Sequence, residues 1–420
     1  MLEKPELFDS RKSFEVTVLA LLLVILLRLT FEYFSYRSFI EKPFYFTNAA
    51  VLNAYEKTKN NRTYTVLKLQ AEEGFTFYTT SHKKEDFQDS ILRLQIFPND
   101  NIAFNDYLGT FYVKSRIKSV EKMPSTFKNT LMNYVSAQHT ESALAGFYNA
   151  IFFATPIDKV LREKIALLGV SHLVALSGFH LGILWGLLYG LFLLIYRPYQ
   201  QKHFPYRHAL LDVGFVTVIL LGVYLWFVDF PPSLVRSYAM VLVGWAVIVL
   251  GVELLSFKFL ASIGLALLAL FPFLLVSLSF WLSMAGVFYI FLLLQYGKTY
   301  SKWLITLLLI PVGIFLLMLP IVHMIFPVTS VYQLLSPLLS IVFIPFYPFV
   351  MLLHLLGIGG VLDSALLWLF SLPKEGVAHL LPWWVTGLYV GLSIYSIFYK
   401  KAFYVLLGVS VMYSIYIFIA

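Results

Sequence analysis

The chain has 420 residues, of which 59% are hydrophobic and only 13% are charged. A soluble domain carries about 25% charged residues, so this composition excludes an ordinary water-soluble protein and predicts a polytopic helical membrane protein. The sequence contains no cysteine, which excludes disulfides, cysteine-ligated metals and a thiol nucleophile. Basic cytoplasmic loops can account for much of the net charge of +8, so that charge is weak support for a nucleic-acid partner.

The first apolar segment, FEVTVLALLLVILL (residues 14–27), follows Arg11 and Lys12 and is followed directly by Arg28. A secretory signal ends in a small-residue cleavage site, and none appears here. We therefore predict a retained anchor with its N-terminus in the cytoplasm, and residues 1–41 contain that terminus and the anchor.

Residues 42–122 form the one long polar stretch of the chain. Polar and apolar residues alternate at 63–70, 75–80, 91–97 and 107–120. This period of two, with many β-branched and aromatic residues, predicts four or five strands. A small barrel of the OB type, which often binds nucleic acid, fits this length. The stretch holds 12 basic and 9 acidic residues, a mild excess, so a plain extracytoplasmic β-domain remains the alternative interpretation.

Residues 123–170 mix polar and apolar residues at helical spacing and are too polar to span a membrane. They predict amphipathic helices in an interfacial or groove-lining position. Residues 171–420 are apolar almost throughout and predict a multi-span domain. The expected spans are 172–196, 209–228, 234–251, 257–274, 276–296, 303–325, 331–356, 361–373, 383–399 and 402–420. With the anchor, the expected fold is a helical membrane protein of about eleven spans with an OB-like domain inserted after the first span.

The positions of Lys and Arg between the spans predict an orientation. If the β-domain faces outward, the cytoplasmic loops are those that carry the short-loop Lys and Arg, at Arg197–Arg207, Lys258, Lys298–Lys302 and Lys400–Lys401. The outward loops at 229–233 and 323–330 carry neither residue type, and Lys374 is the exception. The β-domain is therefore expected on the outer side of the cytoplasmic membrane.

One span contains three prolines, Pro337, Pro345 and Pro348. Proline removes a backbone donor, and in lipid the freed groups are tolerated only inside protein or beside a wet cavity. The segment predicts either a broken helix at a substrate site or a kinked packing helix.

The stretch GVSHLVALSGFHLGIL (residues 169–184) places His172, Ser177 and His180 at the start of an apolar span. A serine hydrolase would need a G-x-S-x-G elbow, and Ser177 lacks both flanking glycines. Zinc binding by the two histidines lacks a nearby carboxylate and a standard spacing. A structural role is favoured, in which Ser177 and Gly178 interrupt the helix.

This stretch resembles the signature of the ComEC competence family, which is close to G-(I/V)-x-H-L-(L/V)-A-(I/L)-S-G-(L/F)-H. Residues 230–240 (FPPSLVRSYAM), 277–287 (SLSFWLSMAGV) and 337–346 (PLLSIVFIPF) resemble three further family motifs. Ser277 and Ser340 depart from the pattern, because the family often has Gln and Asn there. The sequence also lacks the H-x-H-x-D-H cluster of the family's metallo-β-lactamase-like nuclease domain, so it resembles a short form without that domain.

The resemblance implies a channel that passes one strand of transforming DNA across the cytoplasmic membrane. It implies single-stranded DNA and the bilayer as partners, together with a separate DNA receptor, a nuclease, and an ATP-driven motor or single-strand-binding proteins. We expect no enzyme activity and no cofactor, since the sequence has neither that metal cluster nor a nucleotide-binding G-x-x-x-x-G-K-[ST] motif.

The residues expected to line or shape the DNA path are His172, Ser177, Gly178, His180, Ser233, Arg236, Pro337 and Pro345. Arg236 suits phosphate because its guanidinium is planar, and an Arg beside a span is costly unless it serves a function. An ion pair with Asp229 or Glu253 is the structural alternative for Arg236, and core hydrogen bonding is that for the histidines. A secondary transporter for a smaller anion is the alternative function, whereas the residue spacing disfavours an intramembrane hydrolase.

Overall fold

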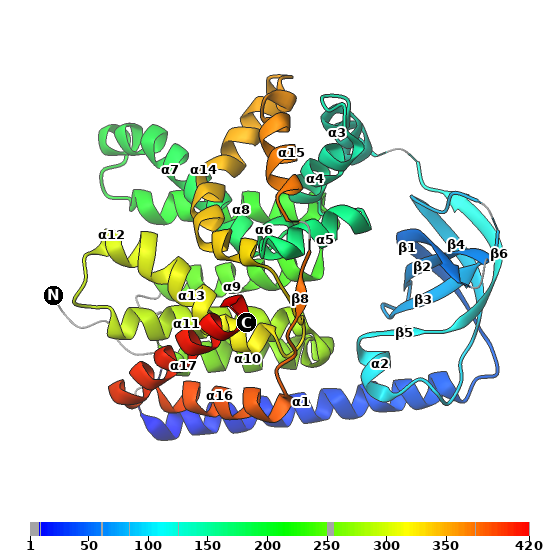
Figure 1. Cartoon of the computed structure of the whole chain (residues 1–420), viewed down its shortest axis with the longest axis horizontal. Helices are drawn as coiled ribbons and strands as arrows, with labels where there is room; N and C mark the ends of the chain where they lie inside the picture. Colours follow the sequence, from blue (N-terminus) through cyan, green and yellow to red (C-terminus); the bar gives the residue numbers. More distant parts are fainter. Residues whose placement is uncertain are drawn as a thin grey trace. The chain divides into compact units, whose positions relative to one another are not determined.

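The computed structural model describes residues 8, 10–59, 62–83, 85–124, 126–249, 256–373 and 375–419. They are mostly helical with one small β-sheet region, and they divide into two compact units. The sheet unit contains residues 8–126 and 261–280, and the helical unit contains residues 127–260 and 281–420. Figure 1 colours the strands of the sheet unit blue to cyan and most of the later helices green to red.

The sheet unit begins with a long helix, α1 (Arg11–Ile40), whose first turn is capped by the Ser10 hydroxyl accepting from Ser13 N at 3.1 Å. The helix is 30 residues long and extends well past the predicted anchor at 14–27. Its last turns carry aromatic side chains that pack on the end of the sheet, as Phe39 does on Phe75 with ring centroids 5.4 Å apart. This packing explains the extra length, because the apolar pattern of a span does not report where a helix meets another element.

The sheet has six strands in the order β5-β3-β2-β1-β4-β6. The strands are β1 (Tyr45–Lys59), β2 (Arg62–Ala71), β3 (Thr76–Ser81), β4 (Ser90–Phe97), β5 (Thr110–Tyr112) and β6 (Lys114–Lys122). The sequence patterns missed β1, which pairs antiparallel with both β2 and β4 and is the centre of the sheet. The start of the predicted strand at 107–120 is instead the end of a short helix, α2 (Phe104–Leu108), in which the Asp106 carboxylate accepts from Ala103 N.

The two edge strands of the sheet are consecutive in the chain. β5 pairs parallel with β3, β6 pairs antiparallel with β4, and only Val113 separates β5 from β6. The N–H of Val113 donates to the Tyr78 carbonyl at 2.9 Å, so the run is hydrogen-bonded throughout. One run of chain therefore borders both edges, and the sheet curls round an apolar core. That core contains Leu67, Leu69, Phe77, Leu92, Leu94, Ile96, Phe111 and Val113.

The chain after the sheet is built from helices. In order they are α3 (Phe127–Ser136), α4 (Ser142–Phe153), α5 (Lys159–Leu167), α6 (Ser171–Val174), α7 (Gly178–His203), α8 (Ala209–Phe227), α9 (Pro232–Val249), α10 (Phe257–Leu270), η1 (Pro272–Val276), α11 (Leu278–Tyr296), α12 (Lys302–Leu304), η2 (Ile305–Leu309), α13 (Ile310–Val322), η3 (Val331–Leu335), α14 (Ser336–Leu355), η4 (Gly359–Leu362), α15 (Asp363–Ser371), α16 (Trp383–Tyr395) and α17 (Lys400–Ile419). Two short strands, β7 (Val328–Thr329) and β8 (Val377–Ala378), pair with each other.

Seven helices among the described residues are long and apolar enough to cross a membrane. They are Arg11–Ile40, Gly178–His203, Ala209–Phe227, Leu278–Tyr296, Lys302–Val322, Val331–Leu355 and Lys400–Ile419. Each coincides with an expected span, so seven of the expected spans are helices of the length and hydropathy that crossing a membrane needs. The other expected spans correspond to α9, α10, α15 and α16, which fall short of that criterion of length and hydropathy among the described residues.

The three prolines of the predicted broken span lie in one continuous helix. Pro337 is near the N-terminus of α14, and Pro345 and Pro348 lie inside it. The helix is assigned through both inner prolines, so the structure favours a packing helix over a broken one.

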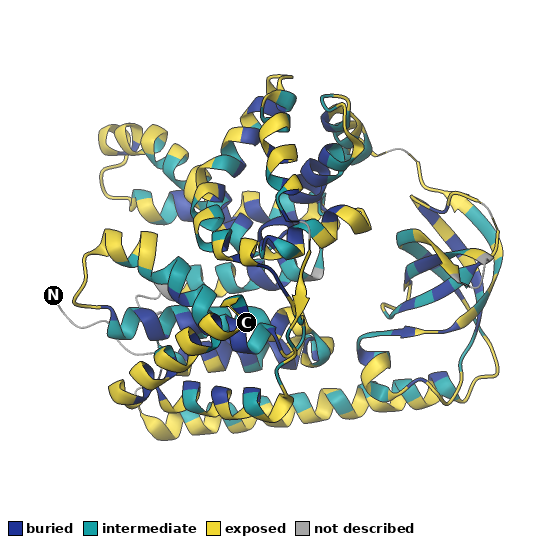
Figure 2. Cartoon of the chain, viewed as in Figure 1, coloured by how far each residue is buried: buried dark blue, intermediate teal, exposed yellow. Residues whose placement is uncertain are grey.

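Within the helical unit, α4 is the helix most thoroughly surrounded by protein. It has buried side chains at Leu144, Phe147, Tyr148, Asn149, Ala150, Ile151, Phe152 and Phe153. Figure 2 shows the contrast between this buried segment and the exposed faces of the outer helices. Helices α3 and α5 keep the amphipathic character expected for 123–170, whereas α4 lies in the core of the unit.

Candidate functional site

Ser177 starts α7. Its backbone is extended (φ −143°, ψ −179°), and its hydroxyl accepts from Phe179 N at 3.3 Å. In return, Ser177 N donates to His180 Nδ1 at 3.3 Å. This is a capping box in which histidine takes the place usually held by Glu or Gln, so the spacing of Ser177 and His180 has a structural cause.

The ring of His180 is fully buried between two aromatic side chains of α14. Its centroid lies 5.2 Å from that of Phe343 and 4.9 Å from that of Tyr347, both edge-on. Within the described part of the chain, His180 Nε2 has no hydrogen-bond partner. A buried polar atom without a partner is costly, so the position of this nitrogen needs an explanation other than core packing.

His172 lies on α6 and reaches α14. Its Nε2 is 3.2 Å from Ser340 Oγ, and the Ser340 hydroxyl donates to the Ser336 carbonyl at 2.8 Å. Since that hydroxyl proton is used, His172 Nε2 is the donor to Ser340. Ser336 Oγ in turn donates to the Gly169 carbonyl at 2.9 Å, so α14 is tied to the start of the motif at two points.

Helix α9 packs against the other side of the motif. Ser233 Oγ donates to the Leu176 carbonyl at 2.7 Å. A Cβ on Gly178 would lie 2.9 Å from Ser237 Oγ and 3.2 Å from Ser237 Cβ. Gly178 is therefore required by the close approach of α7 to α9, and not by its backbone angles.

We call these contacts the polar seam: the loop 169–180 with Ser233 and Ser237 of α9 and Ser336 and Ser340 of α14. Sequence reasoning named His172, Ser177, Gly178, His180 and Ser233, and the structure brings these five together. Ser237 and Ser336 were missed, because Ser237 donates to the Ser233 carbonyl one turn earlier and Ser336 donates to the Gly169 carbonyl of a distant segment, and neither contact leaves a pattern in the sequence.

The remaining predicted site residues lie beside the seam. Arg236 is on α9 between the two seam serines, and its residue is 5% exposed. Pro337 follows Ser336, whereas Pro345 is exposed on α14. Of the ion-pair partners considered for Arg236, Asp229 bonds Lys128 Nζ at 2.7 Å, and Glu253 lies outside the described residues.

The two serines that depart from the family pattern both make contacts. Ser340 bonds His172 as above, and Ser277 Oγ accepts from Phe280 N at 3.4 Å at the start of α11. At both positions the serine hydroxyl makes a hydrogen bond within the chain.

The outer face of the sheet is a second candidate site. Tyr78 of β3 and Tyr112 of β5 alternate with buried residues and so point away from the core, and the strand registers place Tyr55 of β1 and Tyr64 of β2 on the same face. They line a shallow hollow of about 290 Å³ together with Lys57, Val66 and Thr80. The registers pair Lys57 with Tyr64 and Tyr78 with Tyr112, so the rings lie on neighbouring strands.

Basic side chains accompany these tyrosines. Lys68 Nζ lies 6.0 Å from the Tyr78 ring centroid. The run that follows Tyr112 exposes Lys114, Arg116 and Lys118 at every second residue. This face joins aromatic rings to positive charge, which sequence reasoning missed because it counted charges over the whole stretch rather than by strand face.

A third cluster, His139, His354 and Asp363, was also missed by sequence reasoning. These residues are far apart in the sequence and lie at helix ends in the helical unit. The available signal was the presence of His354 in an apolar span, because an ionisable residue there is a functional hypothesis by default.

These features define a mostly helical protein with seven membrane-length apolar helices among its described residues, a small β-sheet region, and a seam of serine and histidine between its helices. The chain belongs to the competence protein family, whose model matches residues 154–418. Membership suggests a role in DNA uptake during competence, and it confirms the family resemblance of the motifs. No curated protein and no solved structure matches the chain.

Proposed function

We propose that this protein passes single-stranded transforming DNA across the cytoplasmic membrane. In this proposal the sheet unit is an OB-like domain on the outer side that receives the strand, and the multi-span domain forms the path. The protein binds and moves DNA without cleaving it and without a cofactor. A separate receptor, nuclease and cytoplasmic motor or single-strand-binding proteins act with it.

The order of the strands supports the OB-like assignment. An OB fold is a five-stranded, partly open barrel, and here β5 and β6 together act as its fifth strand. Strand β1 pairs with two neighbours, and the parallel pair β3–β5 brings the last run beside the third strand.

The observation that carries the proposal is the outer face of the sheet. A single strand of DNA presents unstacked bases and a charged backbone, and proteins hold it by stacking bases on aromatic rings beside basic side chains. Tyr55, Tyr64, Tyr78 and Tyr112 supply the rings, and Lys57, Lys68 and Lys114 supply the charge. No acidic side chain occupies the outward positions beside them on the described residues of β1, β2, β3 and β5.

The polar seam supports a path through the helical unit. His180 offers a ring nitrogen that can donate without permanent charge, which suits a polyanion that must also leave, whereas the N–H of His172 is bonded to Ser340. Arg236 lies on α9 between the seam serines and has the planar donor fork that phosphate prefers. The full path is proposed to have about eleven spans, with the shorter helices α9, α10, α15 and α16 completing it.

Binding to the outer face can be measured with the purified protein in lipid nanodiscs and a fluorescent oligothymidine. Replacing Tyr55 or Tyr112 with Ala should weaken binding by about 1–3 kcal/mol per lost stacking platform. Tyr206→Ala is the matched control, since Tyr206 is 78% exposed in the loop between α7 and α8. Unchanged affinity in the Tyr55→Ala, Tyr112→Ala double variant would remove the face from the proposal.

The orientation can be tested separately. Because the sequence has no cysteine, a single cysteine at Lys83 has no background. It should react with an impermeant thiol reagent in spheroplasts. Protection of that cysteine until the membrane is permeabilised would place the sheet unit inside the cell.

The path itself is tested by import of labelled DNA in cells with verified protein levels. Arg236→Ala should abolish import, and Arg236→Lys should retain part of it, since Lys keeps the charge and loses the fork. Wild-type import by Arg236→Ala and by a His172→Ala, His180→Ala double variant would show that these residues only pack. A smaller anion as the transported species would appear as anion flux that persists when DNA import is lost.

A further inference from the structure

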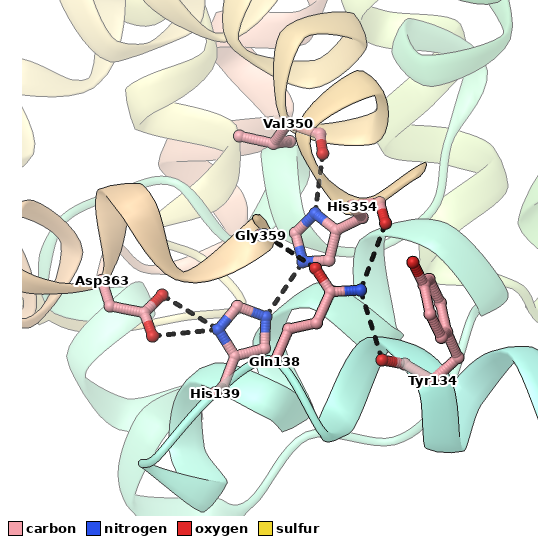
Figure 3. A network of polar contacts seen from close by, with 7 residues as sticks. All are labelled: Tyr134, Gln138, His139, Val350, His354, Gly359 and Asp363. Atoms are coloured by element: carbon pink, nitrogen blue, oxygen red, sulfur yellow. Dashed lines mark hydrogen bonds and ion pairs between the residues drawn. The ribbon is translucent and has the colours of Figure 1, made fainter. Parts of the chain in front are cut away.

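A chain of three ionisable side chains joins three elements of the helical unit. Asp363 begins α15, His139 lies in the turn between α3 and α4, and His354 is near the end of α14. Figure 3 shows the two imidazole rings meeting between these elements, with Asp363 at one end of the chain.

The hydrogen bonds of this chain can be followed atom by atom. His139 Nδ1 lies 2.9 Å and 3.0 Å from the two oxygens of Asp363. His139 Nε2 lies 2.9 Å from His354 Nε2, and His354 Nδ1 lies 2.6 Å from the Val350 carbonyl oxygen. Both ring nitrogens of each histidine are therefore engaged.

Counting protons shows that two neutral rings cannot make these three bonds. A carbonyl oxygen only accepts, so His354 Nδ1 carries a proton. The bond between the two Nε2 atoms needs a second proton, and the bond between His139 and Asp363 needs a third. Two neutral imidazoles beside an ionised carboxylate hold only two protons. The geometry thus requires one proton more, held as an imidazolium–carboxylate pair or on the carboxyl group.

The surroundings of His139 favour the ion-pair form. The ring is stacked on Tyr148 of α4, with centroids 4.5 Å apart and planes 12° apart, and a π face attracts a cation. The His139 side chain is 0% exposed and that of Asp363 is 19% exposed, so the carboxylate is the solvent-facing end of the chain. The other titratable side chain packed on both histidines is Tyr148, and Tyr134 of α3 contributes its backbone carbonyl nearby.

The corner that holds the chain is tightly fitted. Gln138 Nε2 donates to the His354 carbonyl at 3.1 Å, and Gly359 N donates to Gln138 Oε1 at 2.7 Å. A Cβ on Gly359 would lie 2.5 Å from the His354 ring. Only glycine allows this close approach, so the backbone between α14 and α15 is shaped around the histidine.

We propose that Asp363, His139 and His354 form a buried proton-binding site, and that its proton fixes the turn between α3 and α4 to the corner between α14 and α15. The two Nε2 atoms are hydrogen-bonded to each other, which leaves no shared position for a metal ion. The ligand of this site is a proton.

Release of the extra proton removes one of the three hydrogen bonds of the chain. The proton leaves through Asp363 to solvent, and His139 keeps one N–H. That N–H stays with the carboxylate, so the two Nε2 atoms then face each other as lone pairs and their bond is lost. Alternatively, His354 carries its proton on Nε2 instead of Nδ1. It then donates to His139 Nε2, and its bond to the Val350 carbonyl is lost. In both cases one of three bonds disappears, so release loosens the corner, and the tie is present at lower pH and lost as pH rises.

The test is nuclear magnetic resonance of the full chain in detergent micelles with ¹⁵N-labelled histidine, near neutral pH. We expect one buried ring with both nitrogens protonated, assigned to His139 by its absence in His139→Gln. His323, which bonds Leu319 O and Thr329 Oγ1, reports that the fold is intact. A wild-type His139 ring with a single N–H, together with a neutral Asp363 carboxyl by ¹³C shift, would move the proton to Asp363; a single N–H with an ionised carboxylate would overturn the proposal.

Two variants at Asp363 distinguish the effect of its negative charge from a general loss of stability. Asp363→Asn should convert His139 to a singly protonated ring and increase hydrogen exchange at 138–141 and 356–362. Asp363→Glu, which keeps the charge, should retain the doubly protonated ring. Asp212→Asn is the matched control, because it breaks the Arg207–Asp212 pair elsewhere and should leave His139 unchanged. A doubly protonated His139 that persists in folded Asp363→Asn would refute the proposed pair.

Discussion

The strands of the sheet unit and helix α7 of the helical unit place their polar side chains in opposite ways. In β2, Leu67 and Leu69 are fully buried, whereas Lys68 between them faces outward. In α7, the polar ring of His180 is fully buried, whereas Leu194 is 77% exposed. The first arrangement suits water and the second suits hydrocarbon, since lipid accepts exposed leucine but satisfies no polar group. The comparison teaches that burial must be interpreted together with the solvent that surrounds each element.

The difference extends to hydrogen bonding. In the helical unit, buried hydroxyls are bonded to carbonyls of their own helix, as Ser393 is to Tyr389 O at 2.8 Å and Ser410 to Leu406 O at 2.9 Å. Several of these hydroxyls also join helices, since Tyr389 OH lies 2.7 Å from Ser410 Oγ. Polar contacts thus help to specify helix packing where apolar surface faces lipid as readily as protein.

Alanine variants of Leu67 and Leu194 test the comparison most directly. Leu67→Ala leaves a cavity in the sheet core and should cost about 2–5 kcal/mol of stability. Leu194→Ala removes an exposed side chain from α7 and should change stability by less than about 0.5 kcal/mol. Thermal unfolding in micelles with proteolysis of each unit measures both. Equal losses for the two variants would contradict the different surroundings assigned to β2 and α7.

The polar seam should be sensitive to volume where a lipid-facing surface is not. Gly178→Val places its side chain against Ser237 and should cost about 1–3 kcal/mol by overpacking, with loss of DNA import. Gly186→Val on the same helix is the control, because nothing lies within 4 Å of a Cβ there. Tolerance of valine at Gly178 would mean that α7 and α9 are not in close contact.

The cap of α7 gives a smaller effect. Ser177→Ala removes the acceptor for Phe179 N and should cost about 1 kcal/mol. Ser177→Thr keeps a hydroxyl and should restore most of that stability. Thermal midpoints of the two variants measure the difference, and identical midpoints would exclude the capping role.

The smallest effect belongs to a surface pair of the sheet unit. The Lys122 ammonium that donates to Asp86 at 2.9 Å lowers the pKa of that carboxyl below its usual value. Its contribution is therefore present above the carboxyl's unfolded pKa and is lost as pH falls through the folded pKa. Because both side chains are more than half exposed, we expect less than about 0.5 kcal/mol. The stabilities of wild type and Lys122→Met should converge in acid, and a gap that widens in acid would contradict the sign.

Much of the architecture followed from two sequence patterns, which are long apolar runs for the spans and polar–apolar alternation for the strands. Seven of the expected spans were found, and three of the strand patterns coincide with β2, β3 and β4. Strand β1 escaped because Asn48, Ala49, Ala50 and Asn53 give it a weak apolar alternation. Its length and central place come from pairing on both sides, which no single-strand pattern contains. The extra turns of α1 were missed for the same reason, since they depend on contacts with the sheet.

The sequence by itself determined most of the membrane-length helices, the position of the β-domain along the chain, and the family, because hydropathy runs and the motif around Ser177 are local. It also identified the residues that meet at the polar seam, although not their roles as caps and ties. Only the tertiary structure decided that Gly178 is small because of Ser237, that four tyrosines share one face, and that Asp363 meets His139 and His354. These facts concern residues from separate elements, and their energies depend on distances that exist only after the helices and strands have packed.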